Sequence, residues 1–376
     1  MDRERDQDAC PGALQVHQAA DGALVRIRLP GGMLRSDQLE ALARAAAEHG
    51  SATLELTSRG SVQLRGISDT STVADAVAAA DLLPSPTHER VRNIVSSPLS
   101  GRVGGVLDVR PWVAELDAAL RADPVLAGLP GRFWFSFDDG SADVSGLRAD
   151  VGVHVLDDGT PALLLSGTDT GVRLCPDEVI ATLCDVARRF VAIRENRWRV
   201  AELDDPEVLL AELTPTAGPG RSWPVQTHGP VGWLQQRDGR VALGAAVPLG
   251  VLPSRTAEYV AAIGAPIVIT PWRSLLVCDL SDEVADVSLR VLAPQGLIFD
   301  ENSAWLNVSA CVGSPGCERS VADVRADATA AVNSGANIGV GHRHHYVGCE
   351  RACGSPGVGE VLVATVDGYR LRAQPA

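Results

Sequence analysis

The sequence predicts an α+β fold made of two related halves. Segments that alternate apolar and polar residues, as strands do, are interleaved with amphipathic helical segments along the chain. The order of segments in residues 25–66 recurs in residues 241–278, a repeat of about 215 residues that is far longer than a solenoid repeat. We expect the two halves to pair about a pseudo-twofold axis. A chain of 376 residues is also long enough for two or three domains.

The first half opens with a strand, a helix and two further strands. The strands are expected at residues 25–29, 52–56 and 61–66. Ser36 is expected to cap the helix, which should end near Gly50. The same elements are expected again in the second half: a strand at 241–247, a helix through 257–263 and strands within 267–278.

Each half should continue into a longer α/β segment. In the first half the expected elements are strands at 132–137, 151–156 and 161–165 and a helix at 176–193. In the second half they are a strand at 305–309, a helix at 320–333 and a segment at 339–347 that leads to Cys349. These patterns divide the chain into a polar tail (1–20), a first half-domain (21–80), a first α/β domain (81–200), a proline-rich linker (201–235), a second half-domain (236–285) and a second α/β domain (286–376).

Composition excludes several classes of protein. The net charge of −14 argues against binding to nucleic acid or to an anionic membrane surface. The chain has no run of 18 apolar residues, and its polar start has no apolar leader core, so we expect a cytoplasmic protein without a membrane span. All 33 basic residues are arginine, which excludes lysine chemistry and leaves guanidinium groups suited to carboxylates.

Four cysteines near the end of the chain form the most specific motif. Cys311 and Cys317 form a C-x5-C pair, and Cys349 and Cys353 form a C-x3-C pair, both in loops rich in glycine. Four thiolates from two tight loops suit a [4Fe–4S] cluster. The alternatives are structural zinc, which usually has more closely spaced pairs, and two disulfides, which need an oxidising compartment. The remaining cysteines are isolated and are expected to be small buried residues or inert thiols.

These features resemble the nitrite and sulfite reductase superfamily, whose members combine two ferredoxin-like half-domains with two α/β domains and the same cysteine pattern. The resemblance covers about residues 20–370. The segments that carry it are LTSRGSVQLRGI (56–67), VRNIVSSPLSG (91–101), LPGRF (129–133), SACVGSPGC (309–317) and VGCERACG (347–354). The resemblance implies a duplicated reductase-like architecture in which Cys311, Cys317, Cys349 and Cys353 bind the cluster.

Within the superfamily, the segments are most similar to the branch that oxidises precorrin-3A in aerobic cobalamin biosynthesis. Sulfite reductases place two lysines over siroheme and the bound anion, whereas the matching positions here are Arg132 and Trp134. The resemblance implies O2-dependent hydroxylation of precorrin-3A at C20 with lactone formation. The alternatives are a siroheme-dependent sulfite or nitrite reductase and a non-catalytic iron–sulfur electron carrier.

The same resemblance implies further partners. A second iron centre, either non-haem iron or siroheme, would lie nearest Cys353. Because no G-x-G-x-x-G motif follows a strand, electrons are expected from an external donor, either a reduced nicotinamide acting through a reductase or a ferredoxin. The internal duplication favours a pseudo-dimeric monomer.

The resemblance also implies roles for polar residues in the first half. Gln63 and Arg65 are two positions apart on a strand and should share one face. The predicted catalytic residues are Arg59, Arg92 and Arg132. The predicted substrate-binding residues are Arg59, Gln63, Arg65, Arg92, Asn93, Arg132 and Arg351. The alternative for these side chains is a solvated surface, and a structural role is expected for Arg273, the counterpart of Arg59.

The sequence also contains three histidines close to the second cysteine pair. His342, His344 and His345 precede Cys349. Imidazole suits iron, but alternation between core and surface on a strand explains the spacing equally well, so no role is assigned to them.

Overall fold

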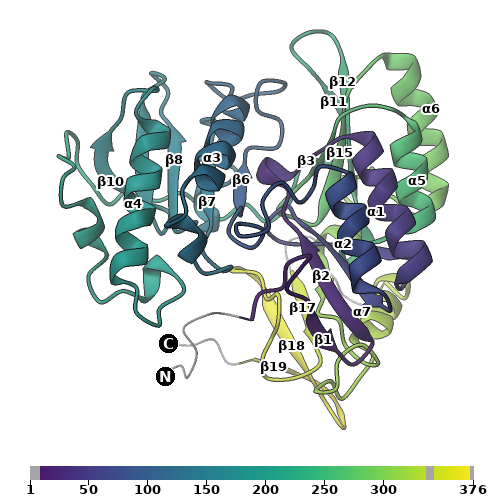
Figure 1. Ribbon diagram of the computed structural model, residues 1–376. Coiled ribbons are helices and arrows are strands. Elements are labelled where there is room, and N and C mark those ends of the chain that lie inside the picture. Colours follow the sequence, from purple (N-terminus) through teal and green to yellow (C-terminus); the bar gives the residue numbers. More distant parts are fainter. Residues whose placement is uncertain (1–8, 336–342, 373–376) are drawn as a thin grey trace.

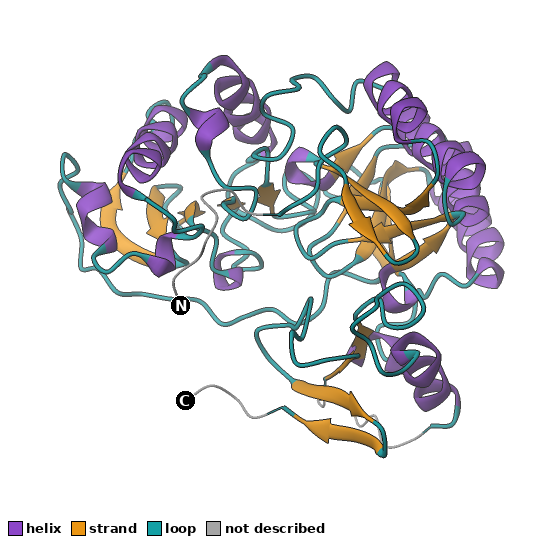
Figure 2. Ribbon diagram, turned by 60° about the horizontal axis from the view of Figure 1, so that its bottom comes forward, coloured by secondary structure: helices purple, strands orange, loops and turns teal. Residues whose placement is uncertain are grey.

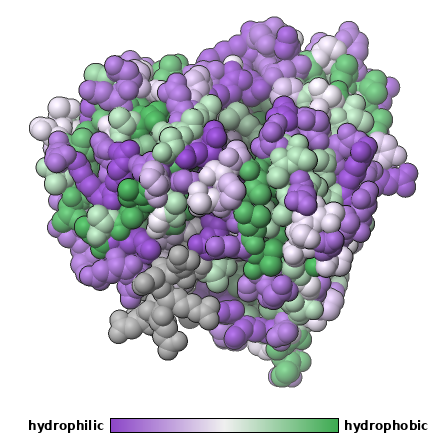
Figure 3. All heavy atoms as spheres, viewed as in Figure 1, coloured by the Kyte–Doolittle hydropathy of each residue, from purple (hydrophilic) through white to green (hydrophobic). Residues whose placement is uncertain are grey.

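A computed structural model describes residues 9–335 and 343–372. Two half-domains with their layer of helices lie side by side with a first α/β domain, and a smaller domain that contains the cysteines lies below them (Figure 1). Polar and apolar residues are intermingled over the face shown in Figure 3. None of the helices described in these ranges is both long and apolar enough to cross a bilayer.

The two half-domains have equivalent five-stranded sheets. The first sheet has the order β1 (His17–Ala19), β2 (Gly22–Ile27), β5 (Val62–Ile67), β4 (Thr53–Leu56) and β13 (Val251–Pro253). The second has the order β11 (Gly232–Gln235), β12 (Val241–Ala246), β15 (Ser274–Leu280), β14 (Ile267–Ile269) and β3 (Met33–Leu34). Each half therefore lends one short strand to the sheet of the other, and the predicted pairing of two related halves is confirmed.

Glycine makes this exchange of strands sterically feasible. Gly32 precedes β3 with a φ of +69°, and a Cβ built on it would lie 2.0 Å from the carbonyl oxygen of Ile269 in the other half. Gly60 has a φ of +62°, and its Cβ would lie 2.9 Å from the same oxygen. Only glycine combines positive φ with so close an approach of two backbones.

Four helices cover the outer faces of the two sheets (Figure 2). They are α1 (Ser36–His49), α2 (Thr70–Ala79), α5 (Ser254–Ala262) and α6 (Asp282–Leu292). The apolar residues of both halves form one continuous core. Ser36 is the first residue of α1 and not its cap. The preceding residue, Arg35, occupies the cap position, and its amide donates to the side chain of Gln38 at 3.0 Å.

The two α/β domains repeat one sheet topology. The first sheet contains β6 (Ile94–Ser96), β7 (Phe135–Asp138), β8 (Val151–Val155), β9 (Pro161–Leu165) and β10 (Thr168–Arg173), with helices α3 (Arg110–Ala122) and α4 (Val179–Ile193). The second contains β16 (Val308–Ala310), β17 (His344–Val347), β18 (Glu360–Thr365) and β19 (Gly368–Leu371), with helix α7 (Val324–Asn333). In both sheets the first two strand pairs are parallel and the third is antiparallel.

Short 3-10 helices connect these elements. They are η1 (Pro30–Gly32), η2 (Leu126–Gly128), η3 (Ser145–Leu147), η4 (Val200–Glu202), η5 (Pro206–Leu210), η6 (Pro248–Gly250), η7 (Ala293–Gln295) and η8 (Ala304–Asn307).

Several elements differ from the sequence-based expectations. The strand expected at 132–137 begins only at Phe135, so Arg132 and Trp134 lie before it. The strand expected at 305–309 begins with η8, and its extended part starts at Val308. Residues 17–19, in the expected tail, and 232–235, in the expected linker, form edge strands, because pairing with β2 and β12 stabilises them. Residues 339–342 lie outside the described residues.

Candidate functional site

Two adjoining cavities lie where the halves and the second α/β domain meet. The arginine cavity, of about 330 Å³, is lined by residues that include Arg59, Arg199, Arg273 and Arg343. The cysteine cavity, of about 670 Å³, is lined by residues that include Cys311, Cys317 and Cys353. The residues that line both are Ser58, Leu249, Gly250, Arg273 and Gly354. Both volumes are in the range of small-molecule sites, and together they offer an extended site.

The sheet topology brings the two cysteine loops together. Cys311 follows β16, and Cys349 comes two residues after the end of β17. These strands are parallel neighbours, so both loops leave the same edge of the sheet. The amide of Cys311 donates to the carbonyl of Tyr346 at 2.9 Å, and the amide of Gly348 donates to the Cys311 sulfur at 3.3 Å.

All four predicted cluster ligands lie near one another. Cys311, Cys317 and Cys353 line the same cavity. Burial raises the pKa of the Cys353 thiol, and the proximity of Cys311, Cys349 and Cys317 raises it further. The four are free thiols without disulfide bonds. Their convergence matches what the spacing C-x5-C and C-x3-C predicts.

Four cysteine thiolates can bind either a single metal ion or an iron–sulfur cluster. Within the described ranges, no three His, Cys, Asp or Glu side chains lie close enough to bind a single metal ion. A four-iron cluster is wider than one ion and takes four cysteine sulfurs at its corners. Four thiols that lie near one another, with the amide of Gly348 donating to the Cys311 sulfur, fit such a cluster.

The loop that contains Cys353 is held from two sides. The Nε2–H of His345 donates to the carbonyl of Cys353 at 3.0 Å, and Nδ1 of His345 therefore accepts from the hydroxyl of Ser309 at 2.8 Å. Burial, and then the charge of Arg273, lowers the pKa of His345 to about 4, so the ring is neutral at pH 7. Arg273 donates to the carbonyl of Gly354 at 3.1 Å.

The neighbouring His344 has a different partner. His344 lies within 3.2 Å of Glu360 on the adjacent strand. His342 lies outside the described residues. Of the trio, His345 alone is shown to contact a cysteine loop.

Gln63 and Arg65 share one face of β5, as their spacing predicts, and both line the cysteine cavity. Arg65 forms a bidentate pair with Asp21, with N–O distances of 2.9 and 2.8 Å, and donates to the carbonyl of Gly316 at 3.0 Å. Gln63 accepts from Arg26 at 2.8 Å. Arg65 therefore fastens the first cysteine loop to the first half-domain.

A second arginine supports the same loop. Arg325 of α7 donates to the carbonyl of Cys311 at 3.3 Å and pairs with Glu55 of β4 at 2.6 Å. Arg351 also lines the cysteine cavity, and its side chain is exposed within the C-x3-C loop. The first half-domain is thus joined to the first cysteine loop by the hydrogen bond from Arg65, and to α7 by the ion pair of Glu55 with Arg325.

The arginine cavity has a strongly basic lining. Among the described residues, its lining includes four arginines and His228 but no Asp or Glu. The indole of Trp134 lies between two of the arginines, with the guanidinium of Arg59 at 5.8 Å and that of Arg199 at 5.9 Å from its ring centre. Burial lowers the pKa of Arg59 to about 10, which leaves it charged at neutral pH. Such a lining favours a ligand with several negative charges.

Three residues predicted to bind substrate lie outside both cavities. Arg92 is buried and forms a bidentate pair with Asp117 at 2.5 and 3.0 Å. Asn93 accepts from Arg28 at 2.9 Å and donates to nearby backbone carbonyls. Arg132 is exposed, with its guanidinium 5.0 Å from the ring centre of Trp198. These contacts engage Arg92 and Asn93 in packing and place Arg132 against Trp198. The substrate-binding roles expected of the three residues remain predictions.

Sequence reasoning missed two arginines of the cavity, Arg199 and Arg343. Arg199 is held by the buried carboxylate of Asp150 at 2.8 Å, and no local motif indicates that pairing. Arg343 lies between His342 and His344 in the sequence, and no local motif distinguishes it as a binding residue. Arg273, expected to be structural, lines both cavities, and its position as the counterpart of Arg59 could have indicated this.

Comparison with known proteins supports the fold. Residues 17–79 match the family model described as the nitrite/sulfite reductase ferredoxin-like half domain. The solved structure of the Mycobacterium tuberculosis NirA protein superposes with a TM-score of 0.73 at 22% identity, over 93% of this chain and 74% of that one. The superposition shows that the chain shares the fold of that protein, and the predicted duplicated α+β architecture is confirmed.

Among named proteins, the chain is similar over nearly its full length to the precorrin-3B synthase of Sinorhizobium sp. The two are 27% identical over 381 residues, which cover 96% of this chain and 82% of the relative. The ferredoxin–nitrite reductase of Synechococcus elongatus is 32% identical over 126 residues, which cover 31% of this chain and 25% of that protein.

Proposed function

We propose that this chain is an oxidoreductase of the precorrin-3B synthase type. It would hydroxylate precorrin-3A at C20 with O2 and close a lactone with an acetate side chain. The observation that carries the proposal is the junction of two cavities, one lined by arginine without any carboxylate and the other by three of the four cysteines. A precorrin carries many carboxylates, which guanidinium groups bind through paired hydrogen bonds.

The four cysteines are proposed to hold a [4Fe–4S] cluster. Such a cluster supplies single electrons, which fits a reaction that consumes O2 and reducing equivalents. The chain's own part is to hold the loops. Arg65 and Arg325 fix the first loop through the carbonyls of Gly316 and Cys311, and His345 fixes the second through the carbonyl of Cys353.

The first-half residues at the cavities are proposed to bind and orient the tetrapyrrole. Arg59 stands at the wall of the arginine cavity, with Trp134 beside it. Gln63, Arg65 and Arg351 line the cysteine cavity, where Arg65 is already paired with Asp21. Electrons are proposed to come from an external donor.

A siroheme-dependent sulfite or nitrite reductase is the second candidate. The matching half-domain and the superposition favour it. Reduction of a small anion, however, depends on a dense cluster of cations above it. Arg132 faces Trp198, away from the cavities, and Trp134 lies at the cavity wall where a second cation would be needed. A non-catalytic electron carrier would have no use for the arginine cavity.

The test starts from protein purified without oxygen, whose absorption and EPR spectra report the cluster. Precorrin-3A is then added, followed by 18O2 and a reductant, and the product is analysed by mass. Gain of one labelled oxygen atom supports the proposal. Turnover of sulfite or nitrite without oxygen incorporation would replace it with the second candidate. The Cys349→Ser variant is the control, and it should form no product.

A further inference from the structure

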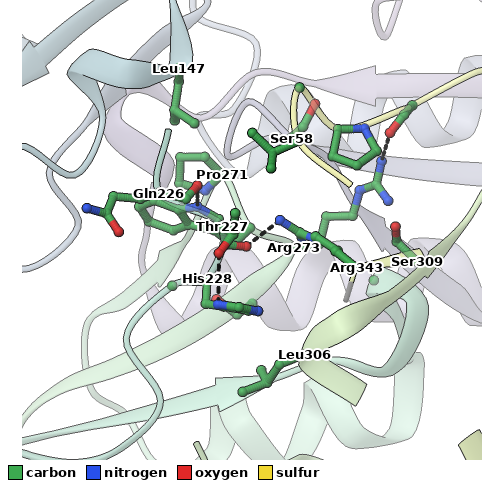
Figure 4. A pocket seen from close by; sticks show the side chains of 18 of the residues that line it. Ser58, Leu147, Gln226, Thr227, His228, Pro271, Arg273, Leu306, Ser309 and Arg343 are labelled. Carbon is green, nitrogen blue, oxygen red and sulfur yellow. Dashed lines mark hydrogen bonds between the residues drawn. The ribbon is translucent and has the colours of Figure 1, made fainter. Parts of the chain in front are cut away.

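Two arginines in the arginine cavity lie close together without an acidic partner. Arg273 comes from the turn between β14 and β15, and Arg343 immediately precedes β17. Neither forms an ion pair with any Asp or Glu in the described part of the chain. Glu55, whose charge acts on Arg273, is committed to Arg325 at 2.6 Å. Figure 4 shows both side chains in the cavity, one reaching towards Thr227 and the other towards the cysteine loop.

Their hydrogen bonds leave donors unused. Arg273 donates to the carbonyl of Gly354 at 3.1 Å, and Arg343 donates through Nη1 to the carbonyl of Thr227. The Nε of Arg343 is buried and has no hydrogen-bond partner. A buried donor without a partner costs about 1–3 kcal/mol, so such groups usually mark a missing partner.

The mutual repulsion of the two guanidinium groups also indicates a missing anion. Burial, and then the charge of Arg273, lowers the pKa of Arg343 to about 10, and burial also lowers the pKa of Arg273. A guanidinium keeps its charge in proteins, so both groups are cationic at neutral pH. Two like charges are therefore held near one another in a region of reduced dielectric, where their repulsion is stronger than in water. An anion between them would remove this repulsion and satisfy the free donor at once.

We propose that Arg273 and Arg343 form a carboxylate-binding subsite that takes one acetate or propionate group of the tetrapyrrole. This inference rests on the proposed function and adds two residues to it. Nε and the second Nη of a guanidinium form a planar fork that matches a carboxylate, and Arg343 offers this edge. Since Arg273 also holds Gly354, the bound group would fix one edge of the macrocycle next to the loop of Cys353.

The experiment uses uroporphyrin III, a stable tetrapyrrole that carries acetate and propionate groups, and the full-length protein purified without oxygen. Quenching of tryptophan fluorescence gives Kd. Arg343→Gln should weaken binding by about tenfold or more, as expected for the loss of a charge-assisted pair. Arg343→Lys should have an intermediate effect, since it keeps the charge but not the fork. Arg255→Gln, which removes an exposed charge on α5, is the matched control and should not change Kd.

Iron content and circular dichroism show whether each variant is folded and loaded, and Arg273→Gln provides a second variant if Arg343→Gln is unstable. Equal Kd values for wild type and a folded Arg343→Gln protein would overturn the subsite and leave the proposed function standing. If wild type does not bind uroporphyrin but binds sulfate in an Arg343-dependent way, the carboxylate assignment and the proposed function both fall. A small oxyanion would then be the ligand.

Discussion

At the scale of single residues, the absence of lysine determines how this protein handles charge. Arginine has a planar fork and remains charged when it is buried, whereas a buried lysine readily loses its proton. The cavities exploit this property, because Arg59 and Arg343 keep their charge despite burial that lowers the pKa of each to about 10. A cavity for a polyanion can therefore include buried arginines such as Arg273 and Arg343, which form no ion pair with a described Asp or Glu.

Replacing a cysteine ligand tests the cluster assignment. Cys349→Ser should abolish the visible absorbance of the cluster and lower the iron content, because a serine hydroxyl does not replace a thiolate ligand. Cys175→Ser is the control, since Cys175 is exposed and lines neither cavity. An unchanged spectrum and iron content in Cys349→Ser would contradict the assignment.

A buried carboxyl group predicts a pH-dependent stability. Burial, and then the charge of Asp138, raises the pKa of Asp143 to about 7 from 3.8, and the hydroxyl of Ser97 donates to it at 2.6 Å. The folded state therefore holds a proton that the unfolded state releases, so this group's contribution falls as pH rises from about 4 to 7. Asp143→Asn should raise the free energy of unfolding at pH 8 by about 2 kcal/mol and have little effect at pH 4.

Urea denaturation at the two pH values measures that difference. Asp75→Asn, on the exposed face of α2, is the control for the loss of one charge. If Asp143→Asn shifts stability equally at pH 4 and pH 8, the buried-proton interpretation is wrong.

At the scale of elements, short strands and loops are held by partners that lie far away in sequence. Strands β3 and β13 are only two and three residues long, and each exists by pairing with a strand of the other half. The cysteine loops are likewise positioned by the parallel pair β16 and β17 and fastened by arginines from outside.

The strand exchange is expected to depend on Gly32. Gly32→Ala would place a Cβ 2.0 Å from the carbonyl oxygen of Ile269, so backbone must move. We expect a loss of about 2–4 kcal/mol in the free energy of unfolding, from positive φ and overlap together. Gly264→Ala is the matched control, because Gly264 also has positive φ but faces open space, and it should cost only about 1 kcal/mol. Equal losses of unfolding free energy in the two variants would show that the approach of Gly32 to the Ile269 carbonyl does not constrain the side chain at position 32.

The hydrogen bond from Arg65 of β5 to the first cysteine loop is expected to slow the loss of iron. Arg65→Gln would remove the bidentate pair with Asp21 and the bond to the carbonyl of Gly316. The loop should become more mobile, so a chelator should strip iron several times faster than from wild type. Arg44→Gln, at an exposed pair on α1, should leave the rate of iron loss unchanged.

At the scale of the whole molecule, we expect the two half-domains to unfold as one cooperative unit. Their apolar residues share a single core, and each sheet contains a strand of the other half. The site follows from this arrangement, since Arg59 and Arg273 occupy equivalent turns in the two halves and both reach the arginine cavity. The two α/β domains share a sheet topology, but only the second contains the loops with Cys311, Cys317, Cys349 and Cys353.

Cooperativity can be tested with Leu252, a fully buried residue of β13 that pairs with Leu54 of the first half. Leu252→Ala should cost about 2–5 kcal/mol. Hydrogen exchange should then show reduced protection in β4 and β5 as well as in the second half. Loss of protection confined to the second half would mean that the halves unfold independently.

Much of the fold was predictable because hydrophobic periodicity is local. Strands such as β8 and β9 and helices such as α1 and α4 were found within a few residues of their observed bounds. The edge strands β1 and β11 were not found, because three or four residues without their partner carry too little pattern. The position of Arg132 was also missed, since the strand begins three residues later and its side chain turns to Trp198.

The sequence by itself was enough to predict the duplicated α+β architecture and to identify the four cysteines as candidate ligands. Hydrophobic periodicity and cysteine spacing are both local features that can be read from neighbouring residues. Only the tertiary structure decided which arginines face the cavities. Arg92 and Arg343 look alike in the sequence, yet Arg92 is neutralised by Asp117, whereas Arg343 reaches a cavity without carboxylates. The physical reason is that the environment of a charge is set by groups distant in the chain, which no local pattern encodes.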